Sequence, residues 1–222
     1  MSGEAALSSL AQAGFTLAAP LATGDYNACV PEAWRLDPSN FGGVWIVGNA
    51  GRLLWPRFCE SAEFHDAEDP LDHYTRRCFG EAATADQDFA LYSAQRDHQY
   101  LPLIALAETA GLGVPGRVGV LLHPEYGPWI SLRGVLFVAE SLQTRRKPGF
   151  DPCTDCAAPC ESACHGGVVS ASGVDVAACY QTRQSLPDCA LRCDARAACV
   201  LGPEHAFERD QVAHHSRIRP RR

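Results

Sequence analysis

Eight cysteines crowd the last third of the chain, between residues 153 and 199. They are Cys153, Cys156, Cys160, Cys164, Cys179, Cys189, Cys193 and Cys199. In a stretch so dense in thiols, we expect metal ligands rather than a large apolar core to fix the chain. A cubane iron–sulfur cluster takes four thiolates, so eight thiolates are what two such clusters require.

The cysteine spacing supports a metal site and leaves its type open. It reads C-x2-C-x3-C-x3-C and then C-x14-C-x9-C-x3-C-x5-C, which is close to the ferredoxin pattern but loosened by a residue at several steps. The sequence therefore predicts one or two 4Fe-4S clusters. Zinc remains an alternative, because His165, His205, His214 and His215 could join the thiols in a mixed site. The third interpretation is that these cysteines form disulfides or are free thiols.

The other three cysteines, Cys29, Cys59 and Cys78, are scattered and bring the total to eleven. An odd total argues against a secreted disulfide framework. The start of the chain lacks a secretory signal, and no apolar run approaches the roughly 20 residues that span a bilayer. We expect a cytoplasmic protein without a membrane partner, in which these three thiols are buried small hydrophobes.

The formal charge of −7 argues against a nucleic-acid partner, because phosphates are held by clustered Lys and Arg. We therefore expect neither tRNA nor DNA to bind. Basic residues cluster only at Arg217–Arg222, which we interpret as a solvated terminus.

Helix and strand signals alternate before the cysteines begin. Helices are predicted at residues 2–13, 52–64, 70–83 and 101–110, and strands at 15–21, 44–51, 88–94, 118–122 and 130–139, the last two as an antiparallel pair. This mixture predicts a three-layer α+β domain. The polar, proline-bearing stretch from residue 141 to 152 suits a boundary, so we expect domains at 1–145 and 146–222, the second with a helical tail.

The segment GLGVPGRVGVLLHPEYGPWISLRGVLFVAE, which begins at Gly111, resembles a block of epoxyqueuosine reductases, which are cobalamin-dependent iron–sulfur enzymes. It is even more similar to the CblC type of cobalamin-processing protein, whose pattern is mirrored by Leu122-His123-Pro124, Tyr126-Gly127, Trp129 and Arg133-Gly134-Val135. The RKP at 146–148 and the run from Glu204 to Gln211 also look like CblC pieces. The resemblance implies a nitroreductase-like fold that holds a corrinoid between a sheet and loops.

The resemblance also implies roles for particular residues. Contacts to cobalamin would come from His123, Tyr126, Trp129, Arg133, Gly111 and Gly113. The alternatives are that His123 only stabilises its loop or is a ligand of the cobalt, that Trp129 is core and that the glycines only make turns. The cysteine module is similar to the reductases alone, and their interleaved pattern would group Cys153, Cys156 and Cys160 with Cys199, and Cys164 with Cys179, Cys189 and Cys193.

Asp97 lies fourteen residues before Gly111. It matches the position of the reductases' proton donor and is the candidate catalytic residue, the alternative being a surface residue at a helix start. A carboxylic acid can serve as a general acid only if its surroundings raise its pKa.

We therefore predict an iron–sulfur redox protein that binds and reduces a corrinoid, a cobalamin-linked reductase. Its partners would be a small-molecule cofactor or substrate and an electron donor such as ferredoxin or flavodoxin, and homodimers are common in nitroreductase-like folds. Two alternatives stay open. One is a non-catalytic corrinoid carrier with structural cysteine or zinc sites. The other is a ferredoxin-like electron carrier without corrinoid, whose first domain is empty or uses a flavin.

Overall fold

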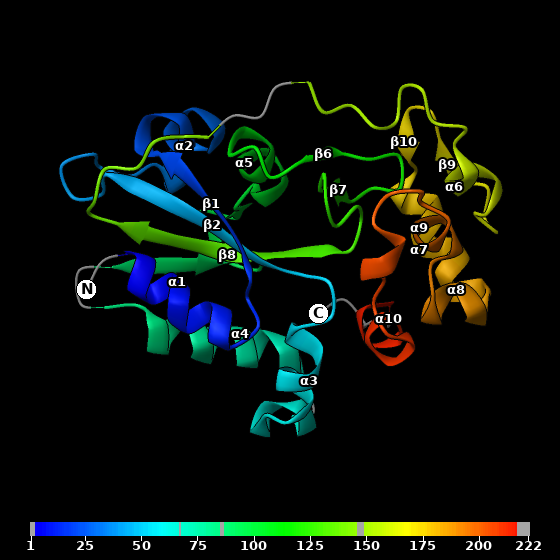
Figure 1. Ribbon diagram of the computed structural model, residues 1–222, viewed down its shortest axis with the longest axis horizontal. Coiled ribbons are helices and arrows are strands. Elements are labelled where there is room, and N and C mark those ends of the chain that lie inside the picture. Colours follow the sequence, from blue (N-terminus) through cyan, green and yellow to red (C-terminus); the bar gives the residue numbers. More distant parts are fainter. Residues whose placement is uncertain (1–2, 67, 85–86, 146–148, 217–222) are drawn as a thin grey trace. The chain divides into compact units, whose positions relative to one another are not determined.

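The computed structural model (Figure 1) describes residues 3–66, 68–84, 87–145 and 149–216. The chain divides into two compact units: unit 1 consists of Met1–Leu112 and Ile130–Pro148, and unit 2 of Gly113–Trp129 and Gly149–Arg222. The cysteine-rich unit thus includes a segment, Gly113–Trp129, that the sequence assigned to the first domain. The RKP at 146–148 and the basic cluster at 217–222 lie outside the described residues.

Unit 1 is built on a four-stranded antiparallel sheet of order β1-β2-β8-β3. Its elements are α1 (Gly3–Gln12), β1 (Leu17–Ala22), α2 (Thr23–Cys29), η1 (Glu32–Trp34), β2 (Gly43–Ala50), α3 (Leu54–Cys59), η2 (Ala62–His65), α4 (Pro70–Ala82), β3 (Asp88–Leu91), β4 (Gln95–Arg96), β5 (Gln99–Tyr100), α5 (Leu103–Thr109) and β8 (Ile130–Val138). Pro20 lies in β1, which is an edge strand, where a residue without an N–H is tolerated.

Helices cover both faces of this sheet, α1 and α4 on one side and α2 and α5 on the other (Figure 1). The α1/α4 side contains a buried apolar cluster that includes Leu10, Phe79 and Leu136. On the other side, the rings of Tyr26 and Phe137 meet edge to face with centroids 5.8 Å apart. Burial on both faces explains why β2 and β8 are nearly continuous apolar runs. The predicted three-layer α+β domain is confirmed.

Two local predictions are wrong. The helix expected at 52–64 is two short pieces, α3 and η2, because the chain turns at Ser61, whose hydroxyl donates to the Phe58 carbonyl. The strands expected at 118–122 and 130–139 do not pair with each other. Residues 121–122 form β7, which pairs with β6, whereas β8 pairs with β2 and β3. The long apolar faces of β2 and β8 bury far more surface together than a two-residue strand could offer.

Unit 2 consists of short elements. They are β6 (Val114–Pro115), β7 (Leu121–Leu122), α6 (Pro159–Ser162), β9 (Val169–Ser170), β10 (Gly173–Val174), α7 (Val176–Ser185), α8 (Pro187–Leu191), α9 (Asp194–Ala197), η3 (Pro203–His205) and α10 (Arg209–Ser216). A small buried cluster joins Cys160, Val169 and Ala195. None of the described helices combines the length and the apolar character needed to cross a membrane.

Candidate functional site

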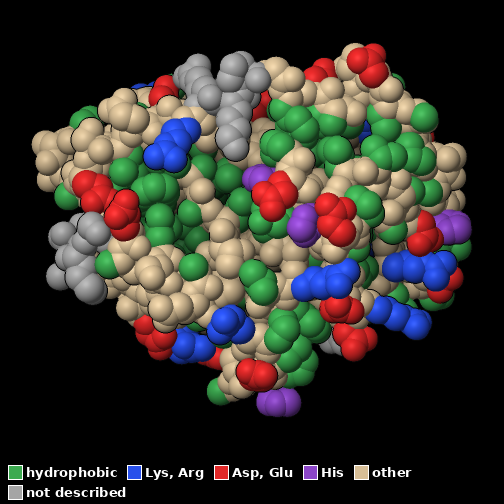
Figure 2. Space-filling view, in the orientation of Figure 1, with side chains coloured by type: hydrophobic (Ala, Val, Ile, Leu, Met, Phe, Trp, Pro, Cys, Tyr) green, Lys and Arg blue, Asp and Glu red, His purple; other side chains and the backbone are tan. Residues whose placement is uncertain are grey.

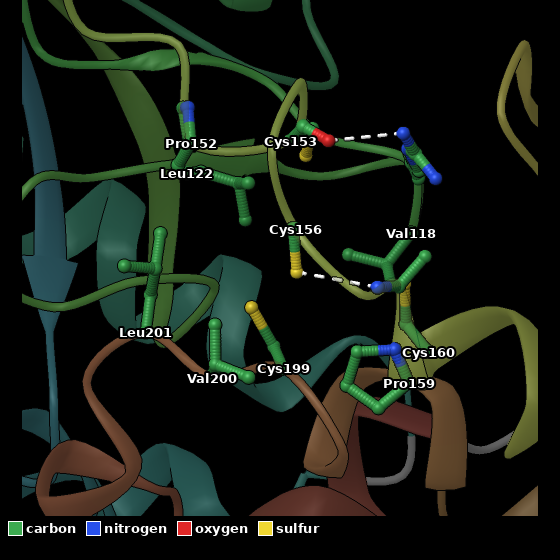
Figure 3. A pocket seen from close by; sticks show the side chains of 12 residues that line it. Val118, Leu122, Pro152, Cys153, Cys156, Pro159, Cys160, Cys199, Val200 and Leu201 are labelled. Atoms are coloured by element: carbon green, nitrogen blue, oxygen red, sulfur yellow. Dashed lines mark hydrogen bonds between the residues drawn. The ribbon is translucent and has the colours of Figure 1, made fainter.

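A hollow in unit 2 is lined by four of the eight clustered cysteines: Cys153, Cys156, Cys160 and Cys199. Figure 3 shows the side chains of Cys156 and Cys199 directed into it. The rest of the lining is Arg117, Val118, Leu122, Pro152, Ala158, Pro159, Val200 and Leu201. Cys153 and Cys156 lie in a loop and Cys160 lies in α6 directly after it, whereas Cys199 comes from a separate segment. The hollow is therefore sulfur-lined, and most of its other walls are apolar.

The segment from Cys153 to Cys160, which carries three of the thiols, is held in place by specific contacts. Arg117 donates from Nη2 to the Cys153 carbonyl at 2.9 Å and from Nη1 to Glu161 Oε1 at 2.6 Å. Ala158 has a left-handed backbone, with φ of 54°, which is costly for a residue with a Cβ. Its N–H points at Cys156 Sγ, 3.4 Å away, and Pro159 then opens α6. Figure 3 draws the hydrogen bond from Arg117 to the Cys153 carbonyl and the one from the Ala158 N–H to Cys156 Sγ.

Cys199 is placed by a close approach of two backbones. Gly127 has φ of +54°, and a Cβ on it would lie 2.2 Å from the Leu201 carbonyl oxygen. Gly202 has φ of +58°, and a Cβ there would lie 2.6 Å from the Tyr126 carbonyl carbon. Only glycine fits at either position, so the segment after Cys199 lies directly against the turn at residues 125–127.

The electrostatics of the thiols separate them into two sets. Burial raises the pKa of Cys160, and Cys199, Cys153 and Cys156 raise it further against an opposing backbone hydrogen bond. Burial also raises the pKa of Cys199, where Cys153 and Cys156 again act in the same direction. These four thiols therefore influence one another.

The second set surrounds Cys179 on α7 and Cys189 on α8. Burial raises the pKa of Cys179; Arg183 opposes this, and the thiols of Cys193, Cys164 and Cys189 add to it. Burial likewise raises the pKa of Cys189, with Cys164 and Cys193 among the groups that raise it further. The two sets contain the same residues as the interleaved grouping that the resemblance implies, and that each binds a cluster stays a prediction.

All eleven cysteines are free thiols. Among the described residues, no three His, Cys, Asp or Glu side chains come close enough together to hold a single metal ion. Of the scattered thiols, Cys78 is buried in the unit 1 core, while Cys29 and Cys59 are half-buried.

The histidines near the thiols have partners of other kinds. His165 Nε2 lies 2.6 Å from Asp194 Oδ2. The His205 ring lies against Tyr126, with centroids 4.6 Å apart, and His215 lies near Phe207 at 5.6 Å.

His123 and Tyr126 lie in the turn that joins β7 to β8. The Nδ1 of His123 accepts hydrogen bonds from the backbone N–H groups of Glu125 and Tyr126, at 3.1 and 3.3 Å. His123 and Gly127 also exchange two backbone hydrogen bonds of 2.9 Å. His123 therefore stabilises its loop, as the alternative reading held, and a corrinoid contact stays a prediction.

Trp129 is buried in unit 2, where its ring packs edge to face on Phe207 with centroids 5.5 Å apart. The guanidinium of Arg196 lies over both rings, at 5.0 and 4.8 Å, and donates to the Pro128 carbonyl. Burial lowers the pKa of Arg196 to about 10, while Cys193 acts in the opposite direction.

The remaining predicted residues lie in different surroundings. Arg133 is buried in β8 of unit 1. Gly111 follows the end of α5 and has φ of +75°, a conformation that favours glycine. A Cβ on Gly113 would lie 2.1 Å from the Leu122 carbonyl oxygen. The structure therefore requires glycine at both positions without any ligand. Asp97 is exposed at the turn between β4 and β5, not at a helix start. Together with His98 it has positive φ, 49° and 61°, as in a two-residue hairpin of type I′.

Sequence reasoning missed Arg117, Ala158 and Arg196. No local pattern marks a left-handed alanine, and an arginine that binds a carbonyl 36 residues away looks like any surface arginine. Asn49 was also missed, although it is a polar residue in the apolar run VWIVGNAG, which is a usable signal.

No family model and no curated protein matches the sequence. Several solved structures are similar to this one. An epoxyqueuosine reductase with an epoxyqueuosine-modified tRNA-Tyr stem loop has TM-score 0.55 and 14% identity, over 95% of this chain and 68% of that one. The B12-trafficking protein CblC from C. elegans has TM-score 0.54 and 14% identity, over 97% and 91%. A catabolic reductive dehalogenase in complex with 3-bromo-4-hydroxybenzoic acid has TM-score 0.56 and 13% identity, over 91% and 32%.

The chain spans 66 to 68% of the length of epoxyqueuosine reductases such as that from Streptococcus thermophilus. The expectation that this chain binds no tRNA is contradicted, since one of the similar structures is an epoxyqueuosine reductase with a tRNA stem loop. Net charge is a sum over the whole chain and does not report local charge. On the face drawn in Figure 2, acidic and basic side chains are interspersed. At identities of 13 to 14% the likeness shows the fold: this chain has the nitroreductase-like α+β fold shared by epoxyqueuosine reductase, CblC and the reductive dehalogenase, with a cysteine-rich C-terminal part, as the resemblance predicted.

Proposed function

We propose that this chain is an iron–sulfur redox protein whose unit 2 binds two four-iron clusters. Cys153, Cys156, Cys160 and Cys199 would hold the first, and Cys164, Cys179, Cys189 and Cys193 the second. The observation that carries the proposal is the hollow into which four cysteines from two separate segments converge. A cubane binds each thiolate at a different iron, so its ligands need not meet at one point. This agrees with the lack, among the described side chains, of a group close enough for one ion.

The surroundings of the first set suit a cluster. When bound, a four-iron cluster supplies one-electron transfer at a potential set by hydrogen bonds to sulfur and by solvent exposure. The Ala158 N–H directed at Cys156 Sγ is a hydrogen bond of that kind. The apolar side chains of Val118, Leu122 and Leu201 line the hollow and would keep water from it. Arg117 holds the Cys153 carbonyl and so fixes the loop.

We further propose that the electrons serve a corrinoid, which makes the protein a cobalamin-linked reductase. The support is the resemblance of residues 111–139 to CblC and the fold shared with a B12-trafficking protein and two kinds of reductase. His123, Trp129 and Arg133 each have structural contacts of their own, so none of them carries this part of the proposal. Asp97 stays a predicted proton donor.

The cluster proposal is tested by metal analysis of protein purified without oxygen. We expect about eight iron and eight sulfide per chain, since each cubane has four of each. Cys160→Ser and Cys189→Ser should each lower the iron to about four, because each removes a ligand from a different set. Cys78→Ser, in the unit 1 core, is the matched control and should keep about eight. Zinc in place of iron, or equal loss in all three variants, would contradict the proposal.

The corrinoid proposal is tested separately by adding hydroxocobalamin to the iron-loaded protein and recording visible spectra before and after a reductant. A shifted corrin band and reduction of the cobalt that the Cys160→Ser variant slows would support it. Binding without faster reduction would indicate a corrinoid carrier. Iron without any corrin shift would indicate an electron carrier.

A further inference from the structure

A buried cation in unit 1 has an incomplete set of hydrogen bonds. Arg133 is 5% exposed, and its Nε donates to Asn49 Oδ1 at 3.1 Å. Asn49 is itself fully buried. Arg133 Nη2 and Asn49 Nδ2 are both buried and have no hydrogen-bond partner among the described residues. Unpaired donors in a protein interior are expensive, and an unpaired charge is more so, which calls for a missing partner.

The backbone directs Arg133 into this position. Val47 pairs with Gly134 while Gly48 pairs with Leu132, so Arg133 is the extra residue of a β-bulge in β8. A bulge re-aims a side chain at the expense of regular pairing, and such irregularities are common beside binding sites. Arg133 thereby shares a face of the sheet with Asn49 of the neighbouring strand, to which it is hydrogen-bonded.

The chemistry of the unpaired atoms narrows the partner to an acceptor. Only the amide oxygen of Asn49 can accept from the Arg133 Nε–H, which fixes the orientation of the amide and leaves its NH2 group unpaired. In the described part of unit 1, every buried side-chain atom without a partner is a donor, the third being Trp45 Nε1. A water molecule would have to donate as well as accept, whereas an anion only accepts.

The charges around Arg133 also favour an anion as the missing partner. Asp72, at the start of α4, acts electrostatically on Arg133, but its two carboxylate oxygens share the one hydrogen bond that the Tyr92 hydroxyl donates, at 2.9 and 3.0 Å. Burial lowers the pKa of Arg133, with Tyr92 and Asp72 in opposition. Asp72 is half-buried and thus partly screened by water, whereas Arg133 is buried.

We propose that Arg133 and Asn49 form a binding site for a small carboxylate, one oxygen of which accepts from Arg133 Nη2 and Asn49 Nδ2. Guanidinium and carboxylate are matched in charge and in planar geometry, which favours a carboxylate over a spherical ion. The site lies wholly in unit 1 and does not depend on the clusters or on a corrinoid, so it goes beyond the function proposed above.

The test compares thermal unfolding of the full-length, metal-loaded chain in sodium acetate and in sodium chloride of the same ionic strength and pH. Acetate should raise the Tm of the wild type with a saturating dependence on concentration, and chloride should not. Asn49→Asp replaces the amide by a carboxylate of the same shape that can bind Nε and Nη2 together. In the absence of acetate, this variant should have a higher Tm than the wild type, and acetate should not raise its Tm further. Asn40→Asp, at an exposed position, is the control and should respond like the wild type.

An acetate response that persists in Asn49→Asp would overturn the proposal, as would an equal response to chloride. If Asn49→Asp does not fold, Arg133→Met serves instead. It removes the guanidinium that would bind the carboxylate and should show no acetate response. Calorimetric titration of the wild type with acetate gives an independent reading, and the lack of saturable binding there would also refute the site.

Discussion

Gly127→Ala should destabilise unit 2 more than a glycine-to-alanine change at a position with free space, because backbone strain and a steric clash add. The residue has φ of +54°, a conformation that costs an L-residue roughly 1–2 kcal/mol. The new Cβ would also lie 2.2 Å from the Leu201 carbonyl oxygen and 2.6 Å from its carbon, which are backbone atoms that cannot rotate away. Overpacking of this kind typically adds about 1–3 kcal/mol. We therefore expect the free energy of unfolding to fall by about 2–5 kcal/mol.

Gly167→Ala is the matched control. Gly167 has nearly the same backbone, with φ of +60°, but a Cβ there would meet nothing within 4 Å. It should therefore cost only the backbone penalty of about 1–2 kcal/mol. Urea unfolding of the protein as purified without oxygen, with its metal content unchanged, followed by circular dichroism, measures both. Equal losses in the two variants would refute the close approach of residues 127 and 201.

Three further outcomes follow from local contacts. Ala158→Gly should raise the free energy of unfolding by about 0.5–1 kcal/mol in urea, because glycine adopts φ of 54° without strain, and a loss would contradict this. Asp175→Ala should lower it by about 1 kcal/mol, since the Asp175 carboxylate caps α7 by accepting from the Ala178 N–H at 3.0 Å, and unchanged stability would refute the cap. Arg77 lowers the pKa of Glu63, so their ion pair stabilises the fold above pH ~4.3 and is lost as the pH falls through the folded pKa. The Arg77 side chain is 44% exposed, so the pair is worth about 0.5 kcal/mol, and Glu63→Gln should flatten the stability profile below that pH if the pair exists.

Sequence patterns predict the elements that bury apolar faces. The apolar run of β2 and the proline that opens α4 are strong local signals, and both elements lie where they were expected. The cysteine spacing likewise marked all the thiols that gather in unit 2. These features depend on residues that lie close together in the chain, so hydrophobic periodicity, proline positions and cysteine spacing are enough to predict them.

Features that depend on distant partners were not predictable. Val118–Leu122 reads as a strand, but its hydrogen-bonding partner is decided by competition among strands elsewhere. The bulge at Arg133 is defined by the pairing of β8 with β2, and the register of that pairing cannot be read from one strand's sequence alone. Ala158 adopts a conformation that its own side chain disfavours, so only the surrounding loop can account for it.

The route of the chain between the units limits how the protein can be divided. Gly113–Trp129 belongs to unit 2, yet the chain then returns to unit 1 as β8, an interior strand of the sheet. A single cut near residue 145 therefore cannot release the cysteine-rich part intact, because Arg117 and Gly127 would remain with the other fragment. A transplant of this module into another protein would have to carry two separate stretches of sequence.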